Sequence, residues 1–141
     1  MSAPWIANRA EAWVLANAAP EGAVLISITD PGREAALPSG YLEVLRLQFH
    51  DCDPEAQTLG PEAAPFRPEQ AEHIWRFAHR HRGRNIVVHC GAGVSRSRAV
   101  VEALLKTFPE YEDRGDESHT PNGLVLRFLL GPARYKDNVK D

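Results

Sequence analysis

The residues best suited to chemistry in this sequence are a cysteine and an arginine six positions apart. Cys90 and Arg96 belong to the run HCGAGVSRS at positions 89–97. Gly91 and Gly93 let the backbone fold into a tight concave loop whose N–H groups point inward, which suits an anion. Arg96 can close this loop and donate two hydrogen bonds to the same oxyanion. The pattern predicts a cradle for a tetrahedral dianion, which means phosphate.

Cys90 lies at the centre of that predicted cradle. A cation or a helix N-terminus beside a cysteine stabilises the thiolate form. We therefore expect Cys90 to attack phosphorus inside its own phosphate-binding loop, and Ser97 to hydrogen-bond the sulfur and help it leave in a second step. The spacing Cys-x5-Arg is weak evidence alone, but the neighbouring histidine, glycine and serine and the strand–loop–helix setting strengthen it. The alternative is a buried cysteine in a glycine turn.

Residues 89–97 resemble the signature of the cysteine-dependent protein tyrosine phosphatases, and residues 92–97 are most similar to the compact dual-specificity branch. The resemblance covers most of the chain, from about residue 23 to residue 130. It implies a phosphocysteine intermediate formed without a metal ion or a cofactor. It also implies that the phosphate is held by the amides and the guanidinium of Gly91, Ala92, Gly93, Val94, Ser95 and Arg96.

Two flanking segments extend this resemblance with less specific motifs. Residues 44–51 resemble the strand that ends in the family's general-acid aspartate, which is Asp51 here. Residues 121–123 resemble a Pro-Asn-x-Gly element that opens the family's last helix, and this gives Asn122 a supporting role. His89 is expected to hydrogen-bond around the loop and support the thiolate. The alternative for this histidine is a strand-end side chain whose polar atoms the backbone satisfies.

Hydrolysis of a phosphomonoester needs a carboxylic acid that protonates the leaving group and then activates water. Asp51, Asp53 and Glu55 all lie on the loop after the second predicted strand. We favour Asp51, with Asp53 and then Glu55 as alternatives. Each could instead be a solvated loop carboxylate, and Asp53 precedes Pro54 as turn-forming aspartates do. The proline-punctuated segment over about residues 50–68 is predicted to be the loop that carries the acid.

Cys52 adjoins the favoured acid and has two interpretations. It is either a small apolar filler or a resolving thiol that traps oxidised Cys90 as a disulfide. A zinc site formed by His50, Cys52, His89 and Cys90 is a further alternative. The sequence lacks the closely spaced Cys or His pairs of common zinc sites, so we expect no metal ion.

Basic residues outside the loop offer few further candidates. The run at residues 79–84 is expected to be a solvated helix C-terminus rather than a substrate or nucleic-acid patch, because it lies at the start of the third strand, whereas the phosphate loop lies at its end. Arg67, Arg98 and Arg127 could contact substrate, but nothing in the sequence selects among them. Residues 110–120 are expected to be an acidic connection.

Alternating apolar segments must position the loop. Strands are predicted over residues 23–28, 41–49 and 86–89, and helices over residues 6–17, 68–82, 98–108 and 122–130. The first helix is preferred over a signal peptide. The second strand does not alternate cleanly, so we expect burial on both of its faces or a bulge. The fold class is therefore α/β, a small mainly parallel central sheet flanked by helices, similar to the dual-specificity phosphatase fold. Side chains expected to face inward from the second and fourth helices are Ala71, Ile74, Trp75, Ala78, Leu124, Val125, Phe128 and Leu129, and the fourth helix is expected to stop at Gly131.

Composition limits the class of protein. A chain of 141 residues with 43% hydrophobic and 25% charged residues predicts one globular phosphatase domain over residues 1–141. A net charge of -3 gives no general field that attracts nucleic acid, and no run is apolar for long enough to span a membrane. Two cysteines are too few for a disulfide scaffold and predict reduced thiols in the cytoplasm.

The expected substrate is a phosphorylated protein or a small phosphomonoester, with the oligomeric state open and a monomer favoured. The loop carries no lysine between Cys90 and Arg96, whereas phosphoinositide-directed members of the family that it resembles often do. We therefore favour phosphotyrosine, with tolerance of phosphoserine and phosphothreonine. Two other functions stay open: a phosphate-reading pseudophosphatase that acts as a binding module, and a rhodanese-like sulfurtransferase.

Overall fold

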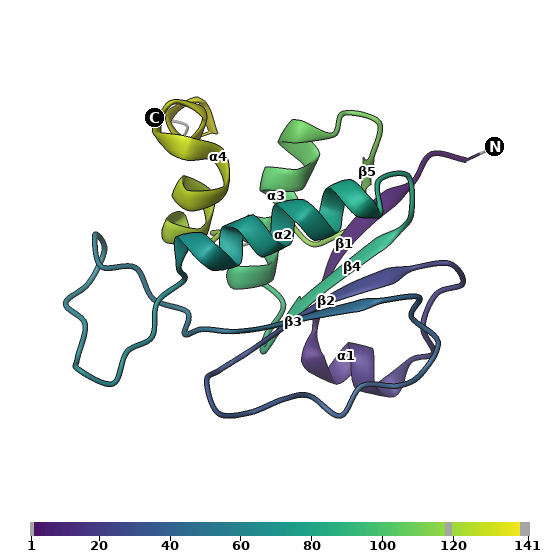
Figure 1. Ribbon diagram of the computed structural model, residues 1–141, viewed down its shortest axis with the longest axis horizontal. Helices are drawn as coiled ribbons and strands as arrows, with labels where there is room; N and C mark the ends of the chain where they lie inside the picture. Colours follow the sequence, from purple (N-terminus) through teal and green to yellow (C-terminus); the bar gives the residue numbers. More distant parts are fainter. Residues whose placement is uncertain (1, 118–119, 139–141) are drawn as a thin grey trace.

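The computed structural model describes residues 2–117 and 120–138 and contains one parallel sheet (Figure 1). In the described residues the strand order is β3-β2-β4-β1-β5. The prediction of an α/β fold with a small parallel sheet flanked by helices is confirmed. The strands span Trp5–Ala10 (β1), Val24–Thr29 (β2), Val44–Gln48 (β3), Ile86–Cys90 (β4) and Glu112–Asp113 (β5). The helices span Glu11–Ala16 (α1), Pro68–Arg80 (α2), Arg96–Thr107 (α3) and Gly123–Asn138 (α4).

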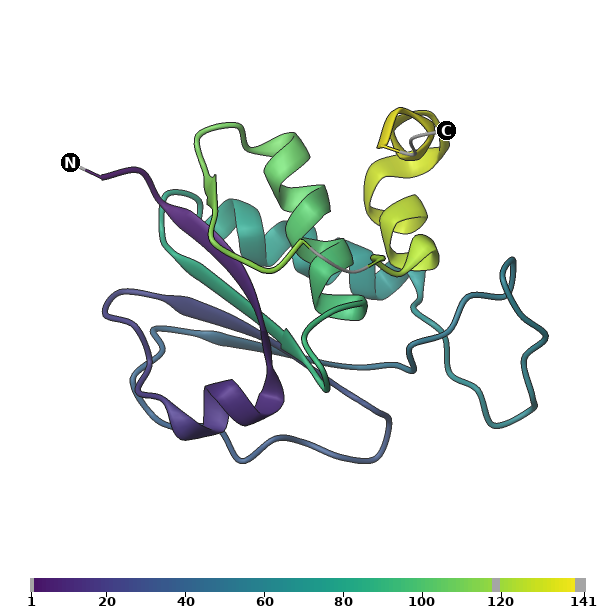
Figure 2. The same cartoon turned by 180° about the vertical axis from the view of Figure 1, so that it is seen from behind.

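Helices cover both faces of this sheet (Figures 1 and 2). Helices α2, α3 and α4 lie on one face and bury the main hydrophobic core against the strands. Helix α1 lies on the opposite face, where Val14 packs with Leu25 and Val87. Strands β2 and β4 are buried along their whole length, as parallel strands between two helical layers are. In the described part of the chain, no helix is long and apolar enough to cross a membrane.

Because the strands are parallel, the carboxyl ends of β1 to β4 meet at one edge of the sheet. Cys90 ends β4 beside Ala10 of β1, and the segments after β2 and β3 leave from the same edge. Ligand sites of open α/β sheets lie at this edge. Residues 49–67, after β3, contain no helix or strand and project from the body of the molecule (Figure 1). The sheet therefore brings the cysteine loop and the predicted acid loop to one end.

The N-terminal segment corrects a prediction. A helix over residues 6–17 is wrong for its first half, because Trp5–Ala10 is strand β1 and only Glu11–Ala16 is helical. Strand β1 pairs with β4 on one side and with β5 on the other. A short apolar pattern with helical spacing fits a strand as well as a helix. Residues 5–10 form a strand because their backbone pairs with β4 and β5 on the two sides. The connection predicted over residues 110–120 is likewise interrupted, because Glu112–Asp113 forms β5.

Strand β3 also differs from the prediction. A bulge is wrong, since the pairing with β2 runs without interruption from Val44 to Gln48. Burial on both faces is confirmed in part: Leu45 packs against the main core and Val44 against the cluster on the face of α1, but within the strand only Leu47 is fully buried. The burial is incomplete because β3 lies at the edge of the sheet. The uneven apolar pattern of residues 41–49 is therefore that of an edge strand whose side chains are only partly buried against the two core clusters.

The predicted helices α2, α3 and α4 are present, with changes to their buried faces. Helix α2 begins at Pro68, and Phe77 is buried while Trp75 is only partly buried. Phe128 of α4 is 39% exposed, so its predicted inward position is wrong. Gly131 has a non-helical backbone that ends the first helical stretch of α4, as the sequence predicts, and a second helical stretch follows it to Asn138. The inward residues that the structure bears out are Ala71, Ile74, Ala78, Leu124, Val125 and Leu129.

Candidate active site

Cys90 occupies the last position of β4 and is 3% exposed. Its Sγ lies 3.2 Å from Oγ of Ser97, in the first turn of α3. A hydroxyl at this distance can donate a hydrogen bond to a thiolate and stabilise its charge. Strand, loop and helix follow one another in the order that the sequence predicts, and the two side chains lie in contact.

The carbonyl groups of the loop between β4 and α3 accept hydrogen bonds from β1 and from the first residue of α1. The amide of Glu11 donates to the carbonyl oxygen of Gly91 at 3.1 Å. Nδ2 of Asn8, which is 1% exposed, donates to the carbonyl oxygen of Gly93 at 2.6 Å. In contrast, the amide N–H groups of residues 91–95 donate to no other group within residues 2–117 and 120–138. A loop whose carbonyls bind the protein and whose N–H groups stay unused is suited to an anion.

Asn8 was missed at the sequence level. It also accepts hydrogen bonds at Oδ1 from the amide of Asp116 at 3.0 Å and from Arg98 at 3.2 Å. This buried amide therefore joins the cysteine loop to the segment after β5. The signal that could have found it is a polar residue inside an apolar strand, but the segment had to be identified as a strand first.

Gly93 permits the close approach between this loop and β1. Its φ is +76°, and a Cβ at this position would lie 2.3 Å from the amide nitrogen of Ala10 and 2.3 Å from the carbonyl carbon of Arg9. The left-handed backbone conformation favours glycine, and the backbone of β1 leaves no space for a Cβ. The second glycine of the predicted anion loop is thus explained by packing against β1.

Gly93→Ala is expected to destabilise the protein by at least about 2 kcal/mol, because the left-handed backbone costs about 1–2 kcal/mol and the overlap with β1 adds to it. Thermal unfolding of the variant measures the loss. Gly32→Ala is the control for the backbone cost, since Gly32 has a φ of +85° with no atom within 4 Å of a Cβ. Gly91→Ala is a second control, because its Cβ would meet only Nη2 of Arg96, at 3.6 Å. A Gly93 variant as stable as the Gly32 variant would contradict the packing argument.

Arg96 begins α3, and two acceptors hold one end of its guanidinium. Nη1 donates to Oδ1 of Asp30 and to the carbonyl oxygen of Phe49, each at 2.8 Å. Nε is buried and has no hydrogen-bond partner in the described residues. Nη2 lies 3.6 Å from where a Cβ on Gly91 would be, and it likewise has no acceptor within the described ranges. The Nε–Nη2 edge is therefore a free, planar pair of donors beside the loop.

Asp30 was not selected as a site residue from the sequence. It follows β2 and begins the turn Asp30, Pro31, Gly32 that the sequence does reveal. The signal was available, because a turn after a parallel strand lies at the same edge of the sheet as the cysteine loop. Pairing with Asp30 fixes the orientation of the Arg96 fork.

His89 is completely buried and connects the end of β4 to β2. Nε2 lies 2.6 Å from Oγ of Ser27, and Nδ1 lies 3.3 Å from the carbonyl oxygen of Cys90. Burial lowers the pKa of His89 below its usual value, so the ring is neutral near pH 7. Because a carbonyl can only accept, Nδ1–H donates to Cys90 and Nε2 accepts from Ser27. The side chain supports the loop through the backbone of Cys90.

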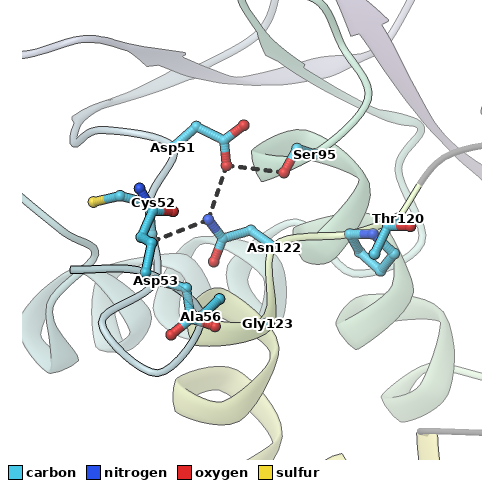
Figure 3. A pocket seen from close by; sticks show the side chains of 10 residues that line it. Asp51, Cys52, Asp53, Ala56, Ser95, Thr120, Asn122 and Gly123 are labelled. Carbon is cyan, nitrogen blue, oxygen red and sulfur yellow. Dashed lines mark hydrogen bonds between the residues drawn. The ribbon is translucent and has the colours of Figure 1, made fainter. Parts of the chain in front are cut away.

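Asp51 lies on the loop after β3, directly beside the cysteine loop (Figure 3). Its Oδ1 accepts hydrogen bonds from Oγ of Ser95 at 2.8 Å and from Nδ2 of Asn122 at 2.9 Å. Oδ1 of Asn122 accepts from the amide of Val125 at 3.1 Å and so caps the start of α4. Three segments distant in the sequence thus meet at Asp51. They line a pocket of about 360 Å³.

The two alternative acids are held differently. Asp53 binds Arg127 through both carboxylate oxygens, at 2.6 and 3.1 Å, and these hydrogen bonds lower the pKa of Asp53 below its usual value. Glu55 lies 2.5 Å from Nε of the same arginine. A carboxylate held by an ion pair is a poor proton donor near neutral pH. The geometry therefore favours Asp51 over Asp53 and Glu55.

Cys52 is 7% exposed, and its sulfur points away from Asn122 (Figure 3). Burial, followed by the charges of Asp51 and Asp53, raises the pKa of Cys52. Cys52 and Cys90 are both free thiols, so the proposed disulfide between them stays a prediction. The zinc alternative has no support in the geometry, because no three His, Cys, Asp or Glu side chains of the described residues are grouped to hold a metal ion.

The structure separates the three arginines that the sequence could not rank. The side chain of Arg98 is 3% exposed and binds Asp113 and Glu102, which gives it a structural role. Arg127 binds Asp53, as described above. Arg67 is exposed at the start of α2.

These contacts place a cysteine inside a loop of unused amide N–H groups, with an arginine fork and a carboxyl group beside it. A comparison with protein-family models found no match for this sequence, and a comparison with curated proteins found none either.

Proposed function

We propose that this protein is a phosphomonoester hydrolase of the cysteine-dependent type, a protein tyrosine or dual-specificity phosphatase with the fold of that family. The observation that carries the proposal is the free Nε–Nη2 edge of Arg96 beside a loop of unused amide N–H groups. Nε of Arg96 is buried, and a buried donor without an acceptor is costly. A phosphate in the loop supplies acceptors to the arginine and to the amides together.

In the first step, Sγ of Cys90 forms a bond to phosphorus while the bond from phosphorus to the leaving oxygen breaks. Asp51, in its protonated form, gives its proton to that oxygen. Arg96 and the loop amides bind the remaining phosphoryl oxygens, whose charge they stabilise in the transition state. The products of this step are the free alcohol or phenol and a phosphocysteine.

The second step regenerates the thiolate. Asp51, now a carboxylate, takes a proton from water as the water oxygen attacks phosphorus. The sulfur–phosphorus bond breaks, and inorganic phosphate is released. The hydroxyl of Ser97, 3.2 Å from the sulfur, donates a hydrogen bond to the departing thiolate. The exposed position of Asp51 leaves the site open to the side chain of a phosphorylated protein.

The direct test is hydrolysis of an aryl phosphate by the purified protein in EDTA. We expect turnover that continues without metal ions and that orthovanadate inhibits. No turnover, with phosphate still bound, would instead support the binding module. Cyanolysis of thiosulfate without phosphate release would support the sulfurtransferase.

Asp51→Asn is expected to lower kcat for a phosphotyrosine peptide by about 10²–10⁴-fold, since it removes the acid but keeps an acceptor for Ser95 and Asn122. The loss should be much smaller for an aryl phosphate whose leaving group is already acidic, because that group departs without a proton. Steady-state kinetics on both substrates measure the difference. Asp53→Asn is the matched control. Equal losses on the two substrates, or a larger loss in the Asp53 variant, would overturn the assignment.

A further inference from the structure

Asn8 of β1 is 1% exposed and uses all four hydrogen-bonding positions of its side-chain amide. Nδ2 donates to the carbonyl oxygens of Gly93, at 2.6 Å, and of Asp116, at 3.1 Å. Oδ1 accepts from the amide of Asp116 at 3.0 Å and from Nη1 of Arg98 at 3.2 Å. The reverse orientation would set the oxygen against two carbonyl groups and the NH₂ group against two donors. The network therefore fixes which end of the amide faces Gly93.

The partners of Asn8 are themselves held in place. The side chain of Arg98 is 3% exposed and binds both carboxylate oxygens of Asp113, at 2.6 and 3.0 Å. Oδ1 of Asp113 also accepts from the amide of Gly115 at 2.9 Å. Glycine is needed for this close packing, because a Cβ on Gly115 would lie 2.0 Å from Oδ1 of Asn8. The donor that Asn8 offers to Gly93 is thus positioned by groups from α3 and from the segment after β5.

The hydrogen bond from Asn8 determines where the next N–H group of the loop points. The peptide unit between Gly93 and Val94 is trans, so its C=O and N–H bonds point in opposite directions. Because the carbonyl oxygen faces Asn8, the N–H of Val94 points away from Asn8, and it donates to no other group in the described part of the chain. Glycine permits many backbone conformations, so this peptide unit can rotate unless a contact holds it.

We propose that Asn8 is a positioning residue of the anion-binding loop, which holds the Gly93–Val94 peptide unit so that the N–H of Val94 faces the phosphate. The inference rests on the proposed function, since it takes the phosphate to lie in the 90–96 loop. Asn8 is buried and acts through the backbone of Gly93. A rotated peptide unit would present a carbonyl oxygen to the phosphate, which repels an anion. Asn8 therefore controls anion affinity and the stabilisation of transition-state charge, in addition to its packing role.

Asn8→Asp is the informative variant, because it keeps the size of the side chain and an acceptor for Arg98 and Asp116 but replaces the donor to Gly93 by an oxygen. We expect its affinity for phosphate and vanadate to fall about tenfold or more, as for the loss of one hydrogen bond to a charged group. The kcat/KM for an aryl phosphate should fall by a similar factor. Calorimetry and steady-state kinetics measure these changes. In amide NMR spectra, the Val94 signal should shift on addition of phosphate to wild type and stay in place in the variant.

Asn8→Ala is the second variant, because it removes the same donor without placing a charge in the interior, and the same losses are expected. Asn85→Ala is the matched control. Oδ1 of Asn85 accepts from the amide of Trp5 at 3.0 Å, so this side chain also binds the backbone of β1, but at the opposite end of the sheet. It should lower the melting temperature and leave phosphate affinity and kcat/KM at the wild-type values. Wild-type phosphate affinity in the Asn8 variants, or an equal fall in Asn85→Ala, would overturn the inference.

Phosphate binding separates this inference from the proposed function. If wild type binds phosphate but hydrolyses nothing, and the Asn8 variants lose that binding, the hydrolase proposal fails and the positioning role stands. If wild type hydrolyses the aryl phosphate and the Asn8 variants keep its affinity and kcat/KM, the positioning role fails and the hydrolase stands. A wild-type protein that neither binds phosphate nor hydrolyses the aryl phosphate would refute both.

Discussion

Cys90→Ser is expected to remove essentially all hydrolysis of aryl phosphates and phosphopeptides, a loss of at least about 10⁴-fold in kcat. The sulfur is the proposed nucleophile, and losing a nucleophile costs nearly the whole chemical rate enhancement. A serine hydroxyl has nearly the same size, so it can keep the contact with Ser97 at the end of β4. The fold and the anion-binding loop should therefore survive while the chemistry stops.

Two measurements accompany the activity assay. Thermal unfolding should show a melting temperature close to that of wild type, and vanadate or phosphate binding should persist. Cys52→Ser is the matched control, because it makes the same exchange at a buried thiol whose raised pKa opposes thiolate formation. Retained activity in Cys90→Ser, or an equal loss in Cys52→Ser, would rule out Cys90 as the nucleophile.

Arg96→Lys should lower kcat/KM by about 10²–10³-fold, although the positive charge is retained. An ammonium group cannot bind Asp30 and the carbonyl oxygen of Phe49 at one end while it presents a planar pair of donors at the other. The magnitude is that of removing one transition-state donor from a site of this kind. Kinetics with an aryl phosphate measure the loss, and a weaker affinity for vanadate should accompany it.

Arg33→Lys is the control for this exchange, since Arg33 forms an exposed ion pair with Glu11 near the same edge of the sheet. It should retain wild-type kinetics within a factor of about two, because exposed ion pairs contribute little. A loss below tenfold in Arg96→Lys would show that a positive charge at position 96 is sufficient and that the planar pair of donors is not required.

Local sequence was sufficient for the centre of the site. Strand β4, the 90–96 loop and α3 are consecutive in the chain. An apolar run, two glycines and a second apolar run specify them in turn, so each element can be predicted from residues close to it in the sequence. The contact between Cys90 and Ser97 arises within this one segment, so spacing predicts it. The N-terminal segment was harder, because strand β1 is specified by its partners β4 and β5 and its own spacing fits a helix equally well.

The sequence alone predicts the centre of the candidate site: a cysteine, an arginine and glycines whose spacing suits an anion, at the end of an apolar strand. The other side chains around that centre became apparent only in the folded structure. Asp30 orients Arg96, and Asn8 binds the carbonyl oxygen of Gly93. Arg127 pairs with Asp53, which leaves Asp51 as the proposed general acid. These pairs lie 66, 85 and 74 residues apart. Contacts between residues so far apart in the chain depend on the order of the strands and the placement of the helices. No local pattern of residues in the sequence shows either of these.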